Sequence, residues 1–171
     1  MVVRLTLGKE KYKEGWAELE ALLPQLDLHR ARLLELVDED TRAYDRIVAS
    51  RKRPKETEAE KALRKKAIDD ATVLATSVPM QTAFYAEQAL RAAPTVTEKG
   101  NPNAASDALV AALLLSAAVE GALANVRINL GGIADPELRR GFAEDADDLA
   151  KKSAASLVTC RTLARSRGLL S

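Results

Sequence analysis

Carboxylate and amide side chains on two helical stretches are the groups in this sequence that could do chemistry. In the stretch from Lys99 to Leu130, Asp107 and Asn125 are eighteen residues apart. That separation is close to five helical turns, so the two side chains share one side of the helix, and Asn129 lies about 40° round from it. Burying such groups costs roughly 1–3 kcal/mol each unless something bonds to them. They either bond to neighbouring helices and fix their register or line a pocket.

Asp40 occupies a position where an apolar residue is expected. It lies one turn from Leu36 and one turn from Tyr44, on what reads as the apolar stripe of a long helix. An unpaired buried charge is too costly to keep, so this carboxyl group must be partnered, protonated or functional. Because burial favours the protonated form of a carboxyl group, such a residue suits a general acid or base near neutral pH.

Several other kinds of chemistry are excluded by the residue types. The single cysteine, Cys160, leaves no internal disulfide and no multi-cysteine metal site, and it is expected to pack as a small apolar side chain. The single histidine, His29, lies among charged residues and is expected at the surface. The sequence has no G-x-S-x-G elbow, P-loop or H-E-x-x-H motif, and no metal site is predicted.

Composition and charge narrow the class of protein further. Aromatic residues make up only 4% of the chain and charged residues 30%, a balance that favours helices over a β core. The formal net charge of +1 predicts no nucleic-acid partner and no anionic membrane partner. The N-terminus lacks the long apolar core of a signal peptide, so a cytoplasmic location is expected.

The elements that must position these residues are helices. Residues 1–171 predict a single all-α domain, a multi-helix bundle of five or six helices joined by short loops. The charge-free run from Ala108 to Val119 is too short for a bilayer, which needs about 20 apolar residues. We therefore expect it to be the buried axis of the bundle, with other helices around most of its circumference.

Helix ends are predicted from local signals. Thr57 and Glu60 form a capping box for a helix that begins there, and Asp135 followed by Pro136 begins the last helix. Gly131 and Gly132 end the central helix. Prolines are expected to interrupt, kink or end the helices in which they lie, at positions 24, 79 and 94.

Five segments of the chain stand out: LTLGKEKY (5–12), LVDEDTRAYD (36–45), RPKETEAEKALRKKAI (53–68), KGNPNAASDA (99–108) and NVRINL (125–130). In this order they resemble the cyclodeaminase/cyclohydrolase family, which contains the formiminotetrahydrofolate cyclodeaminase domain and bacterial methenyltetrahydrofolate cyclohydrolases. GNPNAASDA and NVRINL are specific as a pair, and the resemblance covers nearly the whole chain.

The resemblance implies an all-helical homodimer with a folate cleft at or near the subunit interface. It implies either ring closure of 5-formiminotetrahydrofolate to 5,10-methenyltetrahydrofolate with loss of ammonia, or hydrolysis of the methenyl bridge. No cofactor is implied beyond the tetrahydrofolate substrate. The catalytic candidates are Asp40, on the family's LVDED-type segment, and Asp107; the candidates for substrate binding are Lys9, Asn103, Ser106, Asn125 and Asn129.

The first residues depart from the family pattern. Family members carry an additional helix and a Gly-rich turn before the point that matches Met1, so the domain is expected to lack both. A helical scaffold or assembly protein that kept the family fold without its catalysis is therefore the alternative to an enzyme.

Overall fold

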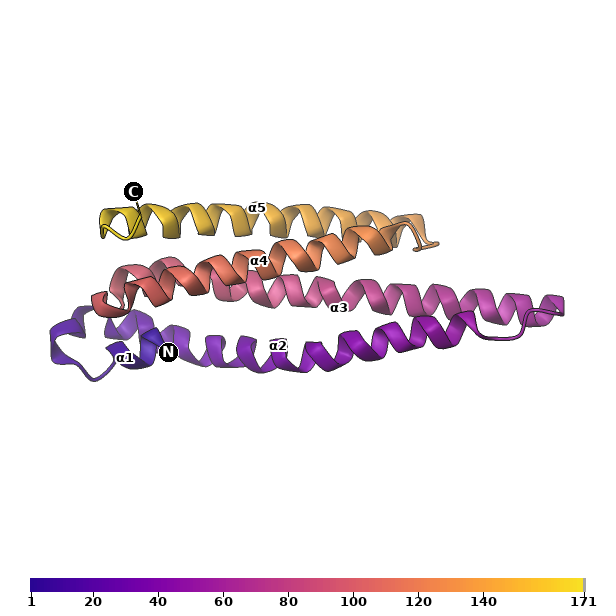
Figure 1. Cartoon of the computed structure of the whole chain (residues 1–171), viewed down its shortest axis with the longest axis horizontal. Coiled ribbons are helices and arrows are strands. Elements are labelled where there is room, and N and C mark those ends of the chain that lie inside the picture. The colour runs from indigo at the N-terminus through magenta and orange to yellow at the C-terminus, as the bar shows by residue number, and fades with distance from the viewer. Residues whose placement is uncertain (171) are drawn as a thin grey trace.

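The computed structural model describes residues 1–170, and every regular element in that range is a helix. This confirms the predicted all-α class; Ser171, the last residue of the predicted domain, lies outside the described residues. Four long helices run along one common direction (Figure 1). They are α2 (Trp16–Arg51), α3 (Glu58–Lys99), α4 (Ala105–Leu130) and α5 (Pro136–Ser166). The short elements are α1 (Val2–Thr6) and the 3₁₀ turns η1 (Glu10–Gly15) and η2 (Pro102–Ala104).

The central helix of the bundle is α3. It packs against each of the other long helices, and α4 and α5 also pack against each other, whereas α2 packs mainly on α3. The tip of the α2–α3 hairpin extends past the ends of α4 and α5 (Figure 1). The fold is thus a three-helix bundle of α3, α4 and α5 with α2 laid along one side of α3.

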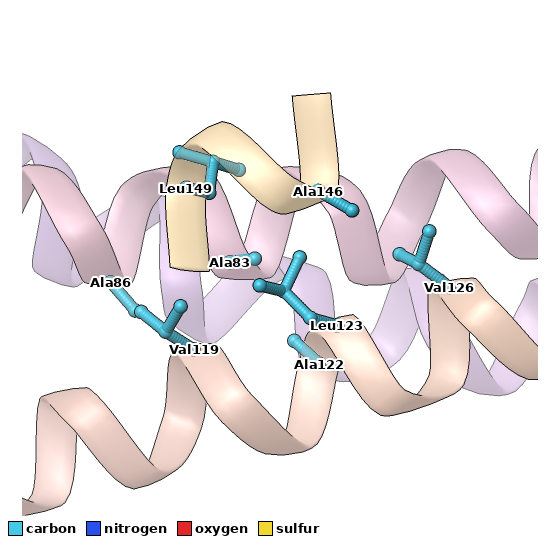
Figure 2. Packing of buried hydrophobic residues seen from close by; sticks show 8 residues of the cluster. All are labelled: Ala83, Ala86, Val119, Ala122, Leu123, Val126, Ala146 and Leu149. Carbon is cyan, nitrogen blue, oxygen red and sulfur yellow. The ribbon is translucent and has the colours of Figure 1, made fainter. Parts of the chain in front are cut away.

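Small side chains form the core where α3, α4 and α5 meet. Half of the residues shown in Figure 2 are alanines, and their short side chains let helix axes approach closely. The cluster consists of Ala83, Ala86, Val119, Ala122, Leu123, Val126, Ala146 and Leu149.

The predicted caps are confirmed. The Thr57 hydroxyl accepts a hydrogen bond from the Glu60 backbone N–H, and the Glu60 carboxylate accepts one from the Thr57 backbone N–H. One Asp135 carboxylate oxygen accepts hydrogen bonds from the backbone N–H groups of the two residues that follow Pro136. Helix α4 ends at Leu130, directly before Gly131.

The predicted helix breaks and ends at the prolines are wrong, whereas the kink that was the alternative at Pro79 stays a prediction. Pro24 lies inside α2, and Pro79 and Pro94 lie inside α3, which runs unbroken for 42 residues. An interior proline costs a helix about 3 kcal/mol or more. Helix α3 contacts three other helices, and this packing holds the chain helical on both sides of each proline.

The prediction that α4 is buried around most of its circumference is also wrong. One face packs on α3 and α5, while Ala111, Leu114, Ala118 and Gly121 are exposed on another. The charge-free run Ala108–Val119 is too short for a bilayer, but Pro102–Leu130 as a whole is long and apolar enough to cross one by length and composition, and it contains an 18-residue window with a mean hydropathy of 1.9. Here the helix is part of the bundle, and 39% of that apolar window is buried inside it.

Candidate active site

Three of the predicted site residues lie together in one cleft. Asp40 on α2 and Asn125 and Asn129 on α4 line a cavity of about 460 Å³, whose floor comes from α3. We call it the Asp40 cleft. Its remaining lining residues are Ala43, Tyr44, Ile47, Arg51, Thr72, Ala75, Pro79, Ile128 and Gly132.

Asp40 is exposed on the wall of this cleft, so the expectation that it is buried is wrong for the single chain. The buried positions of α2 are Leu36 and Ala43, which are 2% and 1% exposed. Because α2 packs mainly on one helix, its buried stripe is narrow and repeats every seven residues, and Asp40 falls beside it. Tyr44, expected on the same stripe, is 68% exposed and also faces the cleft.

Asn129 is held by the proline in α3. Pro79 has no N–H, so it cannot donate to the Ala75 carbonyl one turn earlier. The Asn129 side-chain N–H₂ donates to that carbonyl at 2.8 Å instead. The bond fixes the amide plane of Asn129, and the amide oxygen remains available as an acceptor. Asn129 therefore fulfils both of the alternatives left open by the sequence: it bonds to a neighbouring helix, and it lines a pocket.

Sequence reasoning missed Tyr44 and Arg51 as residues of the cleft. Asp40, Tyr44, Ile47 and Arg51 follow one another at intervals of four, three and four residues, which places them on one face of α2. That spacing was a usable signal. Arg51 belongs to the last turn of α2 and brings a positive charge to the cleft.

The remaining candidates lie at the other end of α4. Asp107 lines a second, mainly apolar groove of about 200 Å³, with Leu26 of α2 and Ala111 of α4 among its other lining residues. Asn103 and Ser106 are exposed beside the start of α4, and Lys9 is exposed just before η1. We call this region the Asp107 groove. Asp107 and Asn125 are separated by about 27 Å of helix, so one chain does not bring the two groups together.

A hydrogen-bonded loop fixes the start of α4. The Asn101 side-chain oxygen accepts from the Tyr12 hydroxyl at 2.8 Å and from the Asn103 backbone N–H at 3.0 Å. The Asn101 backbone N–H donates to the Thr6 hydroxyl at 2.8 Å, and Thr6 is buried. The N-terminal segment therefore holds the loop that presents Asn103, Ser106 and Asp107.

His29 and Cys160 are partly or fully enclosed. His29, expected at the surface, is half-buried between α2 and α3 with its ring 5.8 Å from that of Tyr85, and burial lowers its pKa. Cys160 is buried in the core, as predicted, and burial raises the pKa of its thiol. Neither residue lines the Asp40 cleft. Within residues 1–170, no three His, Cys, Asp or Glu side chains gather as they would around a metal ion.

Known proteins resemble this chain along most of its length. The family model of formiminotransferase-cyclodeaminase matches residues 1–148. Methenyltetrahydrofolate cyclohydrolase of Methylorubrum extorquens is 37% identical over 145 residues, which is 85% of this chain and 68% of that protein. Formimidoyltransferase-cyclodeaminase of Sus scrofa is 31% identical over 167 residues, and the chain spans only 31% of its length.

A solved structure has the same fold. The crystal structure of formiminotetrahydrofolate cyclodeaminase from Thermotoga maritima superposes with a TM-score of 0.85 at 25% identity, covering 97% of this chain and 79% of that one. The family model covers most of the chain, and relatives of both names match it. The chain therefore belongs to the folate-related formiminotransferase-cyclodeaminase family, as its five segments predicted.

Proposed function

We propose that this protein is a folate one-carbon enzyme whose reaction takes place in the Asp40 cleft. The substrate is 5-formiminotetrahydrofolate, which is closed to 5,10-methenyltetrahydrofolate with release of ammonia, or 5,10-methenyltetrahydrofolate, which is hydrolysed to 10-formyltetrahydrofolate. The observation that carries the proposal is that Asp40 and two amide side chains line one cleft in a member of this family.

Asp40 is the general acid and base in either reaction. In the cyclisation, N10 of the folate attacks the carbon of the formimino group, an amidine that carries a proton at neutral pH, and the Asp40 carboxylate accepts the proton that N10 loses. The protonated carboxyl group then gives that proton to the departing nitrogen, which leaves as ammonia as the methenyl cation forms. In the hydrolysis, the same carboxylate accepts a proton from the attacking water and passes it to N5 as the carbon–N5 bond breaks, and the remaining hydroxyl proton goes to solvent as the formyl carbonyl forms.

The other residues of the cleft bind and orient the substrate. The free amide oxygen of Asn129 can accept a hydrogen bond from the pterin edge, and the exposed Asn125 amide offers both donors and an acceptor. The Tyr44 ring presents a flat apolar surface for the pterin, and Arg51 can pair with a carboxylate of the glutamate tail.

We further propose that the enzyme is a homodimer that acts in the cytoplasm. It needs no cofactor beyond the tetrahydrofolate substrate and has no nucleic-acid or membrane partner. The homodimer is supported by an exposed apolar face on α4, where Leu114 is 66% and Ile128 is 76% exposed. An apolar face of this kind is typical of an interface between protein chains.

The test is turnover by Asp40→Asn, measured as the change in methenyltetrahydrofolate absorbance with each substrate in turn. Loss of a general acid or base predicts a fall of about 10²–10⁴-fold in kcat. Asp38→Asn is the matched control, because Asp38 is exposed on the same helix and does not line the cleft. Its activity should equal that of the wild type.

Two outcomes would contradict the proposal. Full activity of Asp40→Asn would remove Asp40 from the mechanism. A wild-type protein that neither turns over the two folates nor binds them in calorimetry would favour the alternative, a helical scaffold that retains the family fold.

A further inference from the structure

Positive charge is concentrated at the tip of the α2–α3 hairpin, which extends past the ends of α4 and α5 (Figure 1). Residues 46–66 contain nine Lys and Arg side chains and three Glu side chains, which gives this segment a net charge of +6. The whole chain has a net charge of only +1, so its other residues together carry −5. The tip is therefore a basic surface on a nearly neutral protein.

Few of these nine cations are neutralised by the protein itself. In the part of the chain that the structure describes, the one ion pair that they form joins Lys61 to Glu58, at 2.8 Å. Arg64 donates to the backbone carbonyl of Arg51 at 3.2 Å, which leaves its charge unpaired. The tip thus keeps free positive charge that attracts an acidic molecule.

A groove between α2 and α3 runs through this basic tip, and we call it the tip groove. Its volume is about 340 Å³, and its floor is formed by apolar side chains of α3 that recur every three or four residues: Leu63, Ala67, Ala71 and Leu74. These residues span about 16 Å of helix, or three turns. Leu63 is 63% exposed, because the hairpin here lies beyond the ends of α4 and α5 (Figure 1).

Basic side chains border the tip groove on both sides. Arg46 comes from α2, Arg53 from the loop that follows it and Lys66 from α3, and all three are exposed. Asp70 is the one carboxylate among the lining residues. An apolar floor beneath a basic rim is complementary to a helix with apolar side chains on one side and carboxylates on the other.

We propose that the tip groove is the docking site for an acidic amphipathic helix of a partner protein. That helix lays its apolar side chains on the floor of the groove and places its carboxylates beside Arg46, Arg53 and Lys66. The docking site is independent of the proposed function, since the tip groove and the Asp40 cleft share no lining residue. On α2, Arg46 of the groove lies about 100° round the helix from Ile47 of the cleft.

Two other kinds of anionic partner fit the tip less well. Residues 46–74 contain no aromatic residue, so the tip offers no ring on which a nucleic-acid base could stack. A membrane surface takes up a helix whose apolar side chains project outward. Here the apolar floor lies between two helices, and Asp70 at its side would repel an anionic headgroup.

A synthetic peptide tests the docking site on the full chain. The probe is a fluorescent helix of about four turns, with leucines at every third or fourth position, glutamates on the opposite side and alanines between them. Fluorescence anisotropy should show saturable binding that weakens as salt is added, because salt screens attraction between exposed charges. A peptide with the same composition in scrambled order should bind more weakly, because it has no apolar side.

Variants of the groove should lose this binding. Arg46→Glu, Arg53→Glu and Lys66→Glu combined should lower the affinity for the peptide about ten- to a hundredfold, because three attractions become repulsions. Leu63→Gln removes the exposed end of the apolar floor without a change of charge and should lower the affinity about tenfold.

A matched control reverses three charges of the same tip outside the groove. Lys52→Glu, Lys55→Glu and Lys65→Glu combined should retain most of the affinity, because these side chains are exposed and do not line the groove. Folate turnover should be unchanged in both triple variants, since none of the six residues lines the Asp40 cleft.

Equal losses of affinity in the two triple variants would show that only the overall charge matters and would overturn the proposal. So would a wild type that does not bind the peptide, or one that binds the scrambled peptide equally well. Tighter binding to single-stranded RNA or to phosphatidylserine vesicles than to the peptide would overturn it as well. Self-association that light scattering detects in the wild type and not in the groove variant would assign the groove to a second copy of the chain instead.

Discussion

At the scale of single residues, the Asp40 cleft depends on a hydrogen bond that links two helices. Pro79 leaves the Ala75 carbonyl without its helical donor, and Asn129 supplies one from α4. The same amide faces the cleft. The residue that orients the substrate in the proposed reaction is thus also a structural contact between α3 and α4.

Asn129→Ala should lower both stability and activity. Because it leaves the Ala75 carbonyl without a donor, it should cost about 1–3 kcal/mol in the free energy of unfolding, measured by urea titration. Asn125→Ala is the comparison, since Asn125 lines the same cleft but is exposed. It should weaken substrate binding and change stability by less than about 0.5 kcal/mol. Equal stability losses would contradict the structural role given to Asn129.

Glu87 is a buried carboxyl group outside the cleft. Its side chain is 0% exposed, and one carboxylate oxygen has no hydrogen-bond partner, while the other accepts from Gln88 at 3.0 Å. Burial raises its pKa; Asp148 adds to this, and the charges of Arg91 and Lys152 oppose it. Relative to the unfolded chain, the folded state holds this proton more tightly, so Glu87 costs no stability in acid and becomes destabilising as the pH rises through its folded pKa.

Glu87→Gln should therefore stabilise the protein at neutral pH, by about 1–3 kcal/mol, because it removes the buried charge. The gain should shrink as the pH falls below the usual range of a glutamate. Thermal melts of both proteins between acid and neutral pH would measure the difference. Glu20→Gln, an exposed position on α2, is the control and should change little. If Glu87→Gln and the wild type have the same Tm at every pH, burial of the Glu87 charge does not destabilise the fold.

At the scale of elements, local signals predicted where helices begin and tertiary packing decided where they continue. The Thr57–Glu60 capping box and the Asp135 cap depend on residues three apart or fewer, so the sequence contains all that is needed. Pro24 and Pro79 stand within helices because of neighbours that are distant in sequence. Asp40 was placed on a buried stripe because periodicity does not tell how many helices pack against α2.

Three residues of the candidate cleft, Asp40, Asn125 and Asn129, were predictable from the sequence, but their assembly was not. A separation of eighteen residues predicts that Asp107 and Asn125 lie on one side of α4. The structure confirms this, since both lie on the exposed face of that helix. The same count puts them at opposite ends of the bundle. The contact of Asn129 with Ala75 spans 54 residues of sequence and no local pattern announces it.

The capping box provides a test at the scale of one element. Thr57→Ala removes the side-chain acceptor at the start of α3 and should lower the free energy of unfolding by about 1 kcal/mol. Thr159→Ala is a matched control, because Thr159 is exposed on α5 and its hydroxyl only donates to the carbonyl one turn earlier. Turnover should be unchanged in both variants, since neither residue lines the Asp40 cleft. If Thr57→Ala and the wild type have the same free energy of unfolding, packing alone fixes the start of α3.

At the scale of the whole molecule, the proposed homodimer would make stability depend on protein concentration. If folding and pairing are linked, each tenfold dilution weakens the dimer by about 1.4 kcal/mol, which lowers its Tm by a few degrees. If the exposed face of α4 is the dimer interface, Ala118→Glu would place a charge in it and should give a monomer with a lower Tm that no longer varies with concentration.

Ala124→Glu adds the same charge to an exposed position on another face of α4, so it should retain the concentration dependence of the wild type. Differential scanning calorimetry over a hundredfold range of concentration measures both properties. A wild-type Tm that is constant over this range would mean that the protomer is stable by itself. The exposed face of α4 would then stay in contact with water, and its apolar residues Leu114 and Ile128 would not be covered by a second chain.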